Sequence, residues 1–308
     1  MRVCFFGMGS IGKRHLNNLS VVCKKKNISL NIDVFRNTDK ELNYEVKELI
    51  ENEIFNYDDL QNSYDAIFIT NPTSMHYETL KSNLNRTKNF FIEKPVFDKG
   101  YNINEIKLRD DGIYYVACPL RYSNVILKLR ELIEGGEKPF SVRAISSSYL
   151  PDWRPNADYR KTYSAMKELG GGVSIDLIHE LDYLTYLFGM PDEIIRCIGK
   201  YSNLEINSDD LALYICKYKD KLIEVHLDYF GSKQKREVEL YCENKLIVGD
   251  ILRNKLVIGE KEFYFEENTN EKYIREMKYF IECIESGIKT ENEIQNAQNV
   301  LKLSREDY

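Results

Sequence analysis

The chain has 308 residues, of which 43% are hydrophobic and 30% are charged, and its formal net charge is −6 at pH 7. This length allows two domains with sizeable cores. Because the charge is spread along the sequence, we expect neither nucleic acid nor a membrane as a partner. The seven cysteines form no CxxC pair, and no leader or membrane-spanning pattern is evident, so we expect a cytoplasmic protein with reduced thiols.

A predicted strand at residues 3–6 runs directly into a glycine-rich turn, which is followed by a helix-like segment at residues 13–23. A GxGxxG turn in this context is typical of dinucleotide binding. Its glycines allow a tight turn, the approach of a pyrophosphate and close helix–strand packing, and the helix N–H groups bind the phosphates. A glycine turn without a ligand is the alternative. The residues expected at the cofactor are Gly7, Gly9, Ser10, Ile11 and Gly12.

The second predicted strand, residues 29–35, bears on the choice of cofactor. A dinucleotide fold usually has an acid at the end of this strand to bind the adenine-side ribose. Here Asp33 lies inside the strand, and the first two residues after the end of the strand are Arg36 and Asn37. Since an arginine suits a 2′-phosphate, we expect NADP to be favoured over NAD. Two alternatives are that Arg36 lies over the adenine face and that Asp33 binds the ribose of NAD.

The rest of the first half continues to alternate between strands and helices. Strands are predicted at residues 65–70, 90–92 and 113–117, and helices at residues 73–85 and 102–110. This alternation predicts a doubly wound parallel sheet, whose ligands bind at the carboxyl ends of the strands. The glycine turn and the residues that end the later strands are therefore expected on one edge.

One of these strands ends in Thr70, Asn71 and Pro72, and His76 follows in the first turn of the next helix. Because these residues come at the carboxyl end of a strand, we expect them on the cofactor edge. For His76, packing or capping is an alternative role.

The apolar strand at residues 90–92 stops abruptly at Glu93, Lys94 and Pro95. A lysine at the end of a buried strand is costly unless its charge or its donors are needed there. Pro95 also restricts Lys94 to an extended conformation. We therefore expect Glu93 and Lys94 at the cofactor edge, whereas an exposed Glu–Lys pair is the simpler alternative.

The second half has a different pattern. A helix at residues 123–134 and a strand at residues 140–149 are followed, over residues 194–265, by several short strands with hairpin-length breaks. Such breaks indicate a largely antiparallel sheet. After these strands, two helices are predicted at residues 271–285 and 291–303.

A long loop at residues 150–163 contains two prolines, several aromatic residues and the single tryptophan. Ordered loops of this kind are usually functional, and an arginine can bind a phosphate or carboxylate at two points. We therefore expect an anionic group on the substrate. The alternative is that the arginines pair with Asp152 and Asp158 to hold the loop. The predicted substrate-binding residues of the loop are Trp153, Arg154, Arg160 and Tyr163.

Three glycines open a predicted helix at residues 173–188. At about 100° per residue, Asp176 and His179 lie close together on the side opposite an apolar stripe. An ordinary polar face is one alternative, and a metal site formed with Asp182 is a weaker one. The stripe expected in the core is Leu177, Leu181, Leu184 and Phe188.

Five motifs, in this order, resemble those of the Gfo/Idh/MocA oxidoreductases over nearly the whole length. They are the GxGxxG turn with Arg14-His15, Thr70-Asn71-Pro72-Thr73 with His76, Glu93-Lys94-Pro95, Leu120-Arg121-Tyr122, and Gly170-Gly171-Gly172 leading to Asp176, His179 and Asp182. The resemblance implies an α/β protein. Residues 1–119 would form a Rossmann domain with a doubly wound parallel sheet. Residues 120–308 would form an α+β domain with a large, mainly antiparallel open sheet, which binds substrate and forms a homo-dimer or homo-tetramer.

The resemblance also implies an NAD(P)-dependent dehydrogenase or reductase that acts on a secondary alcohol or ketone of a sugar-like substrate. Lys94 and His179 would be the catalytic pair, with Asp176 beside them, and Arg121 would bind substrate. Many members place the histidine four residues after the aspartate, whereas the step here is three. The segment at residues 149–180 is similar to a branch associated with bacterial surface sugars.

Two other functions occur on this fold: glycoside hydrolysis by transient, NAD-dependent oxidation, and sugar sensing without catalysis. Retention of Lys94 and His179 argues against the sensor but not against the glycosidase.

Overall fold

The computed structural model describes residues 1–38 and 41–306. Its internal contacts divide the chain into two compact units. The first contains Met1–Pro119 and Asn270–Asn299, and the second contains Leu120–Thr269 and the residues from Val300 onward. The boundary after Pro119 lies where the sequence predicted it, but residues 270–299, which the prediction placed in the second domain, pack with the first unit. No helix in the described ranges is long and apolar enough to cross a membrane.

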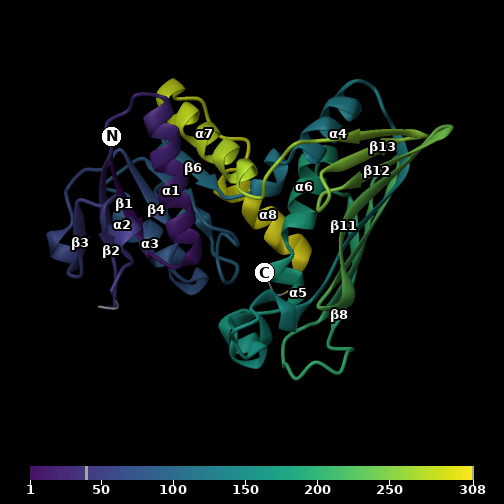
Figure 1. Cartoon of the computed structure of the whole chain (residues 1–308), viewed down its shortest axis with the longest axis horizontal. Helices are drawn as coiled ribbons and strands as arrows, with labels where there is room; N and C mark the ends of the chain where they lie inside the picture. Colours follow the sequence, from purple (N-terminus) through teal and green to yellow (C-terminus); the bar gives the residue numbers. More distant parts are fainter. Residues whose placement is uncertain (39–40, 307–308) are drawn as a thin grey trace. The chain divides into compact units, whose positions relative to one another are not determined.

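The first unit is built on a six-stranded parallel sheet with the strand order β3-β2-β1-β4-β5-β6 (Figure 1). This confirms the predicted doubly wound Rossmann sheet. Its strands are β1 (Arg2–Phe6), β2 (Asn31–Phe35), β3 (Asn52–Ile54), β4 (Ala66–Ile69), β5 (Asn89–Ile92) and β6 (Ile113–Val116). Its helices are α1 (Ser10–Lys25), α2 (Tyr44–Lys47), α3 (His76–Asn83), α7 (Glu271–Ser286) and the first part of α8 (Ile294–Ser304).

A row of aromatic side chains across four adjacent strands explains why α7 belongs to this unit. Phe5, Phe68, Phe91 and Tyr115 are paired in register and are fully buried. Phe280 of α7 packs edge-on against this row, with its ring centroid 5.6 Å from that of Phe68 and 5.3 Å from that of Phe91. Because these strands are buried, they are near-continuous hydrophobic runs, as parallel strands require.

The helix predicted at residues 102–110 is wrong. The segment contains only a short 3-10 turn, Ile103–Glu105, and a chain that continues without regular structure. Ile106 is its only buried residue between positions 102 and 110. An isolated helix of this length is unstable without an apolar face to pack, and this segment has none.

The second unit is built on an eight-stranded sheet with the order β14-β13-β12-β11-β7-β10-β9-β8. All neighbouring pairs are antiparallel except β7 and β10, which confirms the predicted mainly antiparallel sheet. Its strands are β7 (Pro139–Tyr149), β8 (Glu193–Gly199), β9 (Leu211–Lys217), β10 (Leu222–Asp228), β11 (Phe230–Cys242), β12 (Lys245–Asp250), β13 (Lys255–Ile258) and β14 (Lys261–Tyr264).

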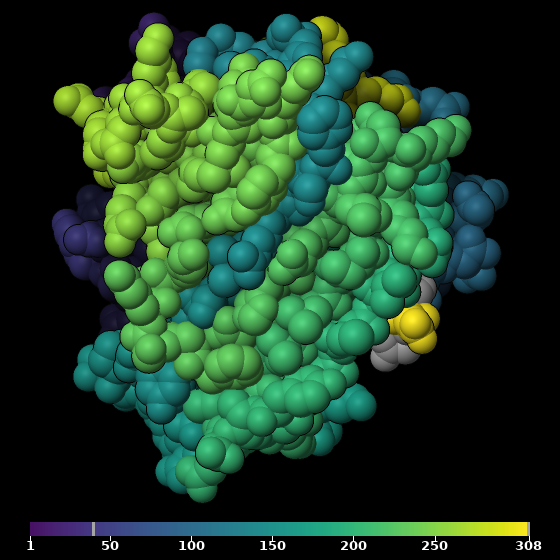
Figure 2. Space-filling model, turned by 90° about the vertical axis from the view of Figure 1, so that its right-hand side faces the viewer, coloured from purple at the N-terminus to yellow at the C-terminus, as the bar shows by residue number. Residues whose placement is uncertain are grey.

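Helices α4 (Asn124–Glu134), α5 (Val173–Asp176) and α6 (His179–Phe188) pack on one face of this sheet. The other face is open: in Figure 2, β7 crosses it in teal between the green strands β11 and β10. The sheet therefore has a covered face and an exposed face.

The single helix predicted at residues 173–188 is in fact two helices, α5 and α6, separated by a turn at Leu177 and Ile178. Every residue from Gly171 to Ile178 is buried. The two candidate residues therefore lie on different helices, with Asp176 ending α5 and His179 beginning α6.

Candidate active site

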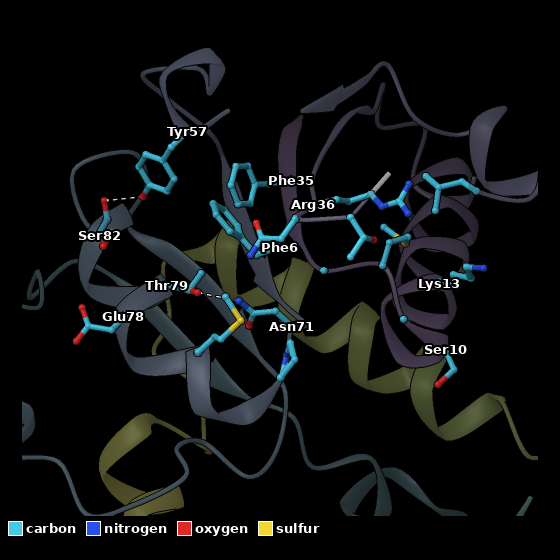
Figure 3. Close-up of a pocket in the computed structure, with 18 of the residues that line it drawn as sticks. Phe6, Ser10, Lys13, Phe35, Arg36, Tyr57, Asn71, Glu78, Thr79 and Ser82 are labelled. Atoms are coloured by element: carbon cyan, nitrogen blue, oxygen red, sulfur yellow. Dashed lines mark hydrogen bonds between the residues drawn. The ribbon is translucent and has the colours of Figure 1, made fainter. Parts of the chain in front are cut away.

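A cavity of about 910 Å³ lies in the first unit, beside the glycine turn and the carboxyl ends of β1, β2 and β4 (Figure 3). Side chains of α1, Ser10 and Lys13, lie on one side of it, and Asn71 and Thr79 lie on the other. Of the predicted cofactor residues, those that line it are Gly7, Gly9, Ser10, Arg36, Asn37, Asn71 and Pro72.

The glycine turn is in contact with the end of β4. Gly7 has a φ of +93°, and a Cβ atom there would lie 2.7 Å from the backbone of Asn71. A Cβ on Gly12 would lie 2.8 Å from the carbonyl oxygen of Gly7 and 2.9 Å from Oγ1 of Thr70, whose hydroxyl donates to that same carbonyl. Only glycine fits at both positions. By contrast, a Cβ on Gly9 would meet nothing within 4 Å, so the backbone there is open to a ligand.

Asp33 of β2 and Arg36, which directly follows β2, have different surroundings. Asp33 is 1% exposed and accepts hydrogen bonds from Nδ2 of Asn52, at 2.8 Å, and from the hydroxyl of Tyr64, at 2.9 Å. It does not line the cavity, so these contacts fit a structural role for Asp33 better than ribose binding. Arg36 does line the cavity and forms an ion pair with Glu53 of β3.

His76 is 1% exposed and lies between two segments of backbone. Nε2 is 3.0 Å from the carbonyl oxygen of Asn71, and Nδ1 is 3.2 Å from the carbonyl oxygens of Pro95 and Val96. Burial lowers the pKa of His76. Because both ring nitrogens face main-chain oxygens and the ring does not line the cavity, the packing role fits His76 better than direct contact with a cofactor.

Glu93 and Lys94 follow the last residue of β5, as predicted. Glu93 is 8% exposed; its Oε1 contacts Nε2 of His15, and its Oε2 accepts from the backbone N–H of Lys94 at 3.1 Å. Burial acts to raise the pKa of Glu93, but the hydrogen bond from His15 and the nearby charges, Lys94 among them, together outweigh it, and the pKa lies below its usual range. Glu93 is thus a buried carboxylate that orients the backbone before Lys94.

In the second unit, Asp176 is held by two tyrosines. It is 5% exposed; the hydroxyl of Tyr229 donates to Oδ2 at 2.5 Å, and the hydroxyl of Tyr163 donates to Oδ1. Burial raises the pKa of both tyrosines well above the usual range, so both remain donors. The indole of Trp153 packs edge-on against Tyr229, with ring centroids 5.3 Å apart. His179 begins α6 and is half-buried.

Tyr229 was not predicted as a site residue. It directly follows β10, 53 positions after its partner Asp176. No spacing or motif in the sequence connects these two residues, and only the packing of α5 beside β10 does so.

The two loop arginines have different surroundings. Arg160 is bonded to Asp158, with Nε 2.8 Å from Oδ1, and to Glu205, with Nη1 3.0 Å from Oε2. It therefore fits the alternative in which an arginine holds the loop. Arg154 is exposed and forms no ion pair within the described ranges, and its charge acts on Tyr163. Of the two loop arginines, Arg154 is thus the one without a carboxylate partner among the described residues.

Arg121 is 3% exposed and forms a two-point ion pair with Asp182, with Nε–Oδ2 and Nη2–Oδ1 distances of 2.8 and 2.7 Å. Its guanidinium also lies 4.9 Å from the ring centroid of Tyr186. These contacts fit a structural role for Arg121 better than direct contact with a substrate. They also occupy the carboxylate that the metal alternative required, and no group of three potential metal ligands occurs among residues 1–38 and 41–306.

Comparison with family models identifies both halves of the chain. Residues 1–108 match the model described as an oxidoreductase family with an NAD-binding Rossmann fold. Residues 126–248 match the model of the GFO/IDH/MocA C-terminal domain. Together the two matches cover more than half of the chain.

Two curated relatives are similar over most of their length. A myo-inositol 2-dehydrogenase from Thermotoga maritima is 25% identical, over 93% of this chain and 89% of that protein. The uncharacterized oxidoreductase YrbE from Bacillus subtilis is also 25% identical, over 92% of this chain and 86% of its own length.

Solved structures share the fold at lower identity. A levoglucosan dehydrogenase in complex with NADH and levoglucosan has a TM-score of 0.82 at 16% identity, covering 99% of this chain and 95% of that one. The UDP-N-acetylglucosamine 3-dehydrogenase GnnA from Acidithiobacillus ferrooxidans has a TM-score of 0.77 at 17% identity, with the same coverage.

Proposed function

Because the chain belongs to the Gfo/Idh/MocA oxidoreductase family, we propose that it is a dehydrogenase or reductase acting on a secondary alcohol or ketone of a sugar-like substrate. The observation that carries this proposal is the cavity at the glycine turn, with Lys94 at the end of a strand in the same sheet. The relatives named as myo-inositol and levoglucosan dehydrogenases support a sugar or polyol substrate.

The cavity suits a nicotinamide dinucleotide, which supplies hydride transfer at nicotinamide C4. Gly9 leaves its backbone open, and the N-terminus of α1 begins at Ser10 with no acidic residue in the first turn, so both would hold the pyrophosphate. Arg36 and Asn37 would bind the adenosine end. Arg36 supports a preference for NADP(H), although Glu53 offsets part of its charge.

Two side chains of the protein would then act directly on the substrate. His179 takes the proton of the substrate hydroxyl, and Lys94 donates a hydrogen bond to the same oxygen and stabilises the charge that develops there. Asp176 has both oxygens bound by tyrosines, which suits a positioning role next to His179 better than proton transfer.

We further propose that the substrate carries an anionic group, such as a carboxylate or a nucleotide diphosphate, which Arg154 binds. Arg154 is the loop arginine whose guanidinium is not paired with a carboxylate in the described ranges. The likeness to the protein named as UDP-N-acetylglucosamine 3-dehydrogenase and the resemblance of residues 149–180 to a surface-sugar branch favour a substrate of this kind.

The open sheet face is proposed to pair two or four copies of the chain in the cytoplasm. Its exposed apolar side chains alternate with an ion pair between Arg143 and Glu224 of adjacent strands, a mixture typical of protein interfaces. If this face forms the interface between copies, Leu222→Glu should lower the molecular mass of the assembly measured in solution. The exposed apolar and aromatic residues of this face include Ile195, Ile215, Leu222, Tyr241, Leu246 and Tyr264.

The experiment that tests the proposed function has two stages. A thermal-shift screen with NAD⁺, NADP⁺, sugars and nucleotide sugars should identify ligands that raise the melting temperature. With the substrate found, Lys94→Ala should lower kcat about 100-fold or more with little change in cofactor affinity. His179→Ala should also be slow, and the two losses should not add, because both groups serve one oxygen. A Lys94→Ala enzyme with near-normal kcat would falsify the proposed function.

The same assay separates the alternatives. A glycosidase would release product with no net formation of NAD(P)H, and a sensor would bind sugar and cofactor without turnover. Net reduction of the cofactor, in proportion to the sugar consumed, excludes both.

A further inference from the structure

His15 is a buried, titratable residue for which the proposed mechanism has no use. It lies in α1, three residues after the last glycine of the turn, and is 0% exposed. Its ring packs against Phe91 of β5, with centroids 4.7 Å apart, and lies 6.2 Å from the ring of Tyr273 of α7. A buried polar group is costly unless it is hydrogen-bonded, and the partner of Nε2 is Oε1 of Glu93.

The contact with Glu93 defines the state of the ring. A carboxylate can only accept hydrogen bonds, so Nε2 of His15 must be the donor. The other ring nitrogen, Nδ1, has no hydrogen-bond partner in the described ranges. The single polar contact of His15 is therefore directed at Glu93.

Glu93 connects His15 to the residue that follows it in the chain, Lys94. Oε1 of Glu93 accepts a hydrogen bond from His15, and Oε2 accepts one from the backbone N–H of Lys94. The hydrogen bond from His15 and the charge of Lys94 both act to keep Glu93 ionised, and the charge of Glu93 in turn acts on the phenol of Tyr273. A continuous chain of contacts thus runs from the cofactor-binding helix α1, through His15 and Glu93, to the backbone of Lys94.

We propose that His15 and Glu93 form a positioning pair that orients Lys94 for its action on the substrate oxygen. The inference rests on the proposed function, in which Lys94 makes that contact. Because the amide of Lys94 is fixed by Glu93, and Glu93 is fixed by His15, loss of the His15 donor releases the strand end. Catalysis depends steeply on such placement, whereas cofactor binding depends on the glycine turn.

The test compares two substitutions of His15. In His15→Gln the side-chain amide keeps a donor near the place of Nε2, whereas His15→Leu has a similar volume and no donor. We expect His15→Leu to lower kcat about 10-fold or more, with the Kd of NAD(P)H within about threefold, and His15→Gln to recover most of the loss. In a Lys94→Ala background the two variants should have equal kcat, because the residue that the pair orients is gone.

A matched control is another buried glutamate of the same unit. Glu276 is 0% exposed and accepts from the hydroxyl of Tyr115, at 3.0 Å, and from the backbone N–H of Cys118, at 2.6 Å. Glu276→Gln should lower the melting temperature without the selective loss of kcat. If His15→Leu does not fold, Glu93→Gln serves in its place, since it removes the charge at nearly constant volume.

The outcomes distinguish the pair from the proposed function. If Lys94→Ala is slow but His15→Leu and His15→Gln have the same kcat, the positioning pair is wrong and the role of Lys94 stands. An equal loss from His15→Leu with and without Lys94 likewise overturns the pair. If Lys94→Ala itself retains kcat, the proposed function fails, and the positioning role fails with it.

Discussion

The hydroxyl of Tyr229 donates a 2.5 Å hydrogen bond to Oδ2 of Asp176, although the two residues are 53 positions apart. Hydrogen bonds to a charged acceptor contribute about 1.5–3 kcal/mol, compared with about 1 kcal/mol for a neutral one. We therefore expect Tyr229→Phe to destabilise the protein more than Tyr214→Phe, which removes a 3.0 Å bond to the carbonyl oxygen of Ser304. Urea unfolding measures the difference.

The same pair of variants tests whether Asp176 positions His179. Tyr229→Phe should lower kcat, whereas Tyr214→Phe, equally buried in the same unit, should not. Equal kcat values in both variants would show that the Asp176 cluster is purely structural.

The ion pair between Arg121 and Asp182 predicts a large effect on stability. Removing one partner of a buried pair costs about 3–5 kcal/mol, because the remaining charge is left without compensation. Arg121→Met should thus lower the melting temperature strongly. Lys128→Met, which breaks the more exposed pair with Glu131 on α4, should cost about 0–1 kcal/mol. If Arg121→Lys melts like the wild type but has a raised KM, Arg121 binds substrate instead.

Gly7 and Gly9 should respond differently to alanine. Gly9→Ala meets no protein atom within 4 Å, and its φ of −70° is ordinary for alanine. We expect it to leave the melting temperature of the free protein unchanged but to abolish the increase caused by NAD(P)⁺, since the methyl group blocks the pyrophosphate. Gly7→Ala, with φ at +93° and Asn71 at 2.7 Å, should lower the melting temperature even without cofactor.

Arg36 should determine the preference between the two cofactors. Arg36→Ala is expected to weaken NADP(H) binding and to leave NAD(H) nearly unchanged, since only NADP(H) carries the 2′-phosphate. Glu53→Gln should have the opposite effect, because it removes the carboxylate that competes for Arg36. Fluorescence titration of the wild type and both variants with both reduced cofactors measures the six dissociation constants. A wild-type protein that binds NAD(H) tenfold more tightly would refute the NADP preference.

Arg154 and Arg160 provide a matched comparison for the anionic substrate. Arg154→Lys should raise KM for that substrate, because a lysine cannot reproduce two-point binding. Arg160→Lys should affect only the order of the loop, since Asp158 and Glu205 already bind its guanidinium. Efficient turnover of a neutral sugar, together with wild-type kinetics in both variants, would exclude an anionic substrate.

The sequence by itself determined the parts of this protein that depend on local pattern. The strand, glycine turn and helix at the start of the chain follow from hydrophobic runs and from the backbone conformation that glycine permits at position 7. The parallel sheet follows from the alternation of strands and helices. Because parallel strands carry ligands at one edge, the positions of Asn71 and Lys94 at strand ends also followed from the sequence.

Tertiary structure alone decided the surroundings of each candidate side chain. Arg121 and Arg154 are both arginines near aromatic residues in the sequence, yet one is buried against Asp182 and the other is exposed. Asp176 and Tyr229 meet because α5 packs beside β10. Burial and ion pairing depend on which groups come within a few ångströms after the chain has folded, and the spacing of residues along the sequence does not specify those distances.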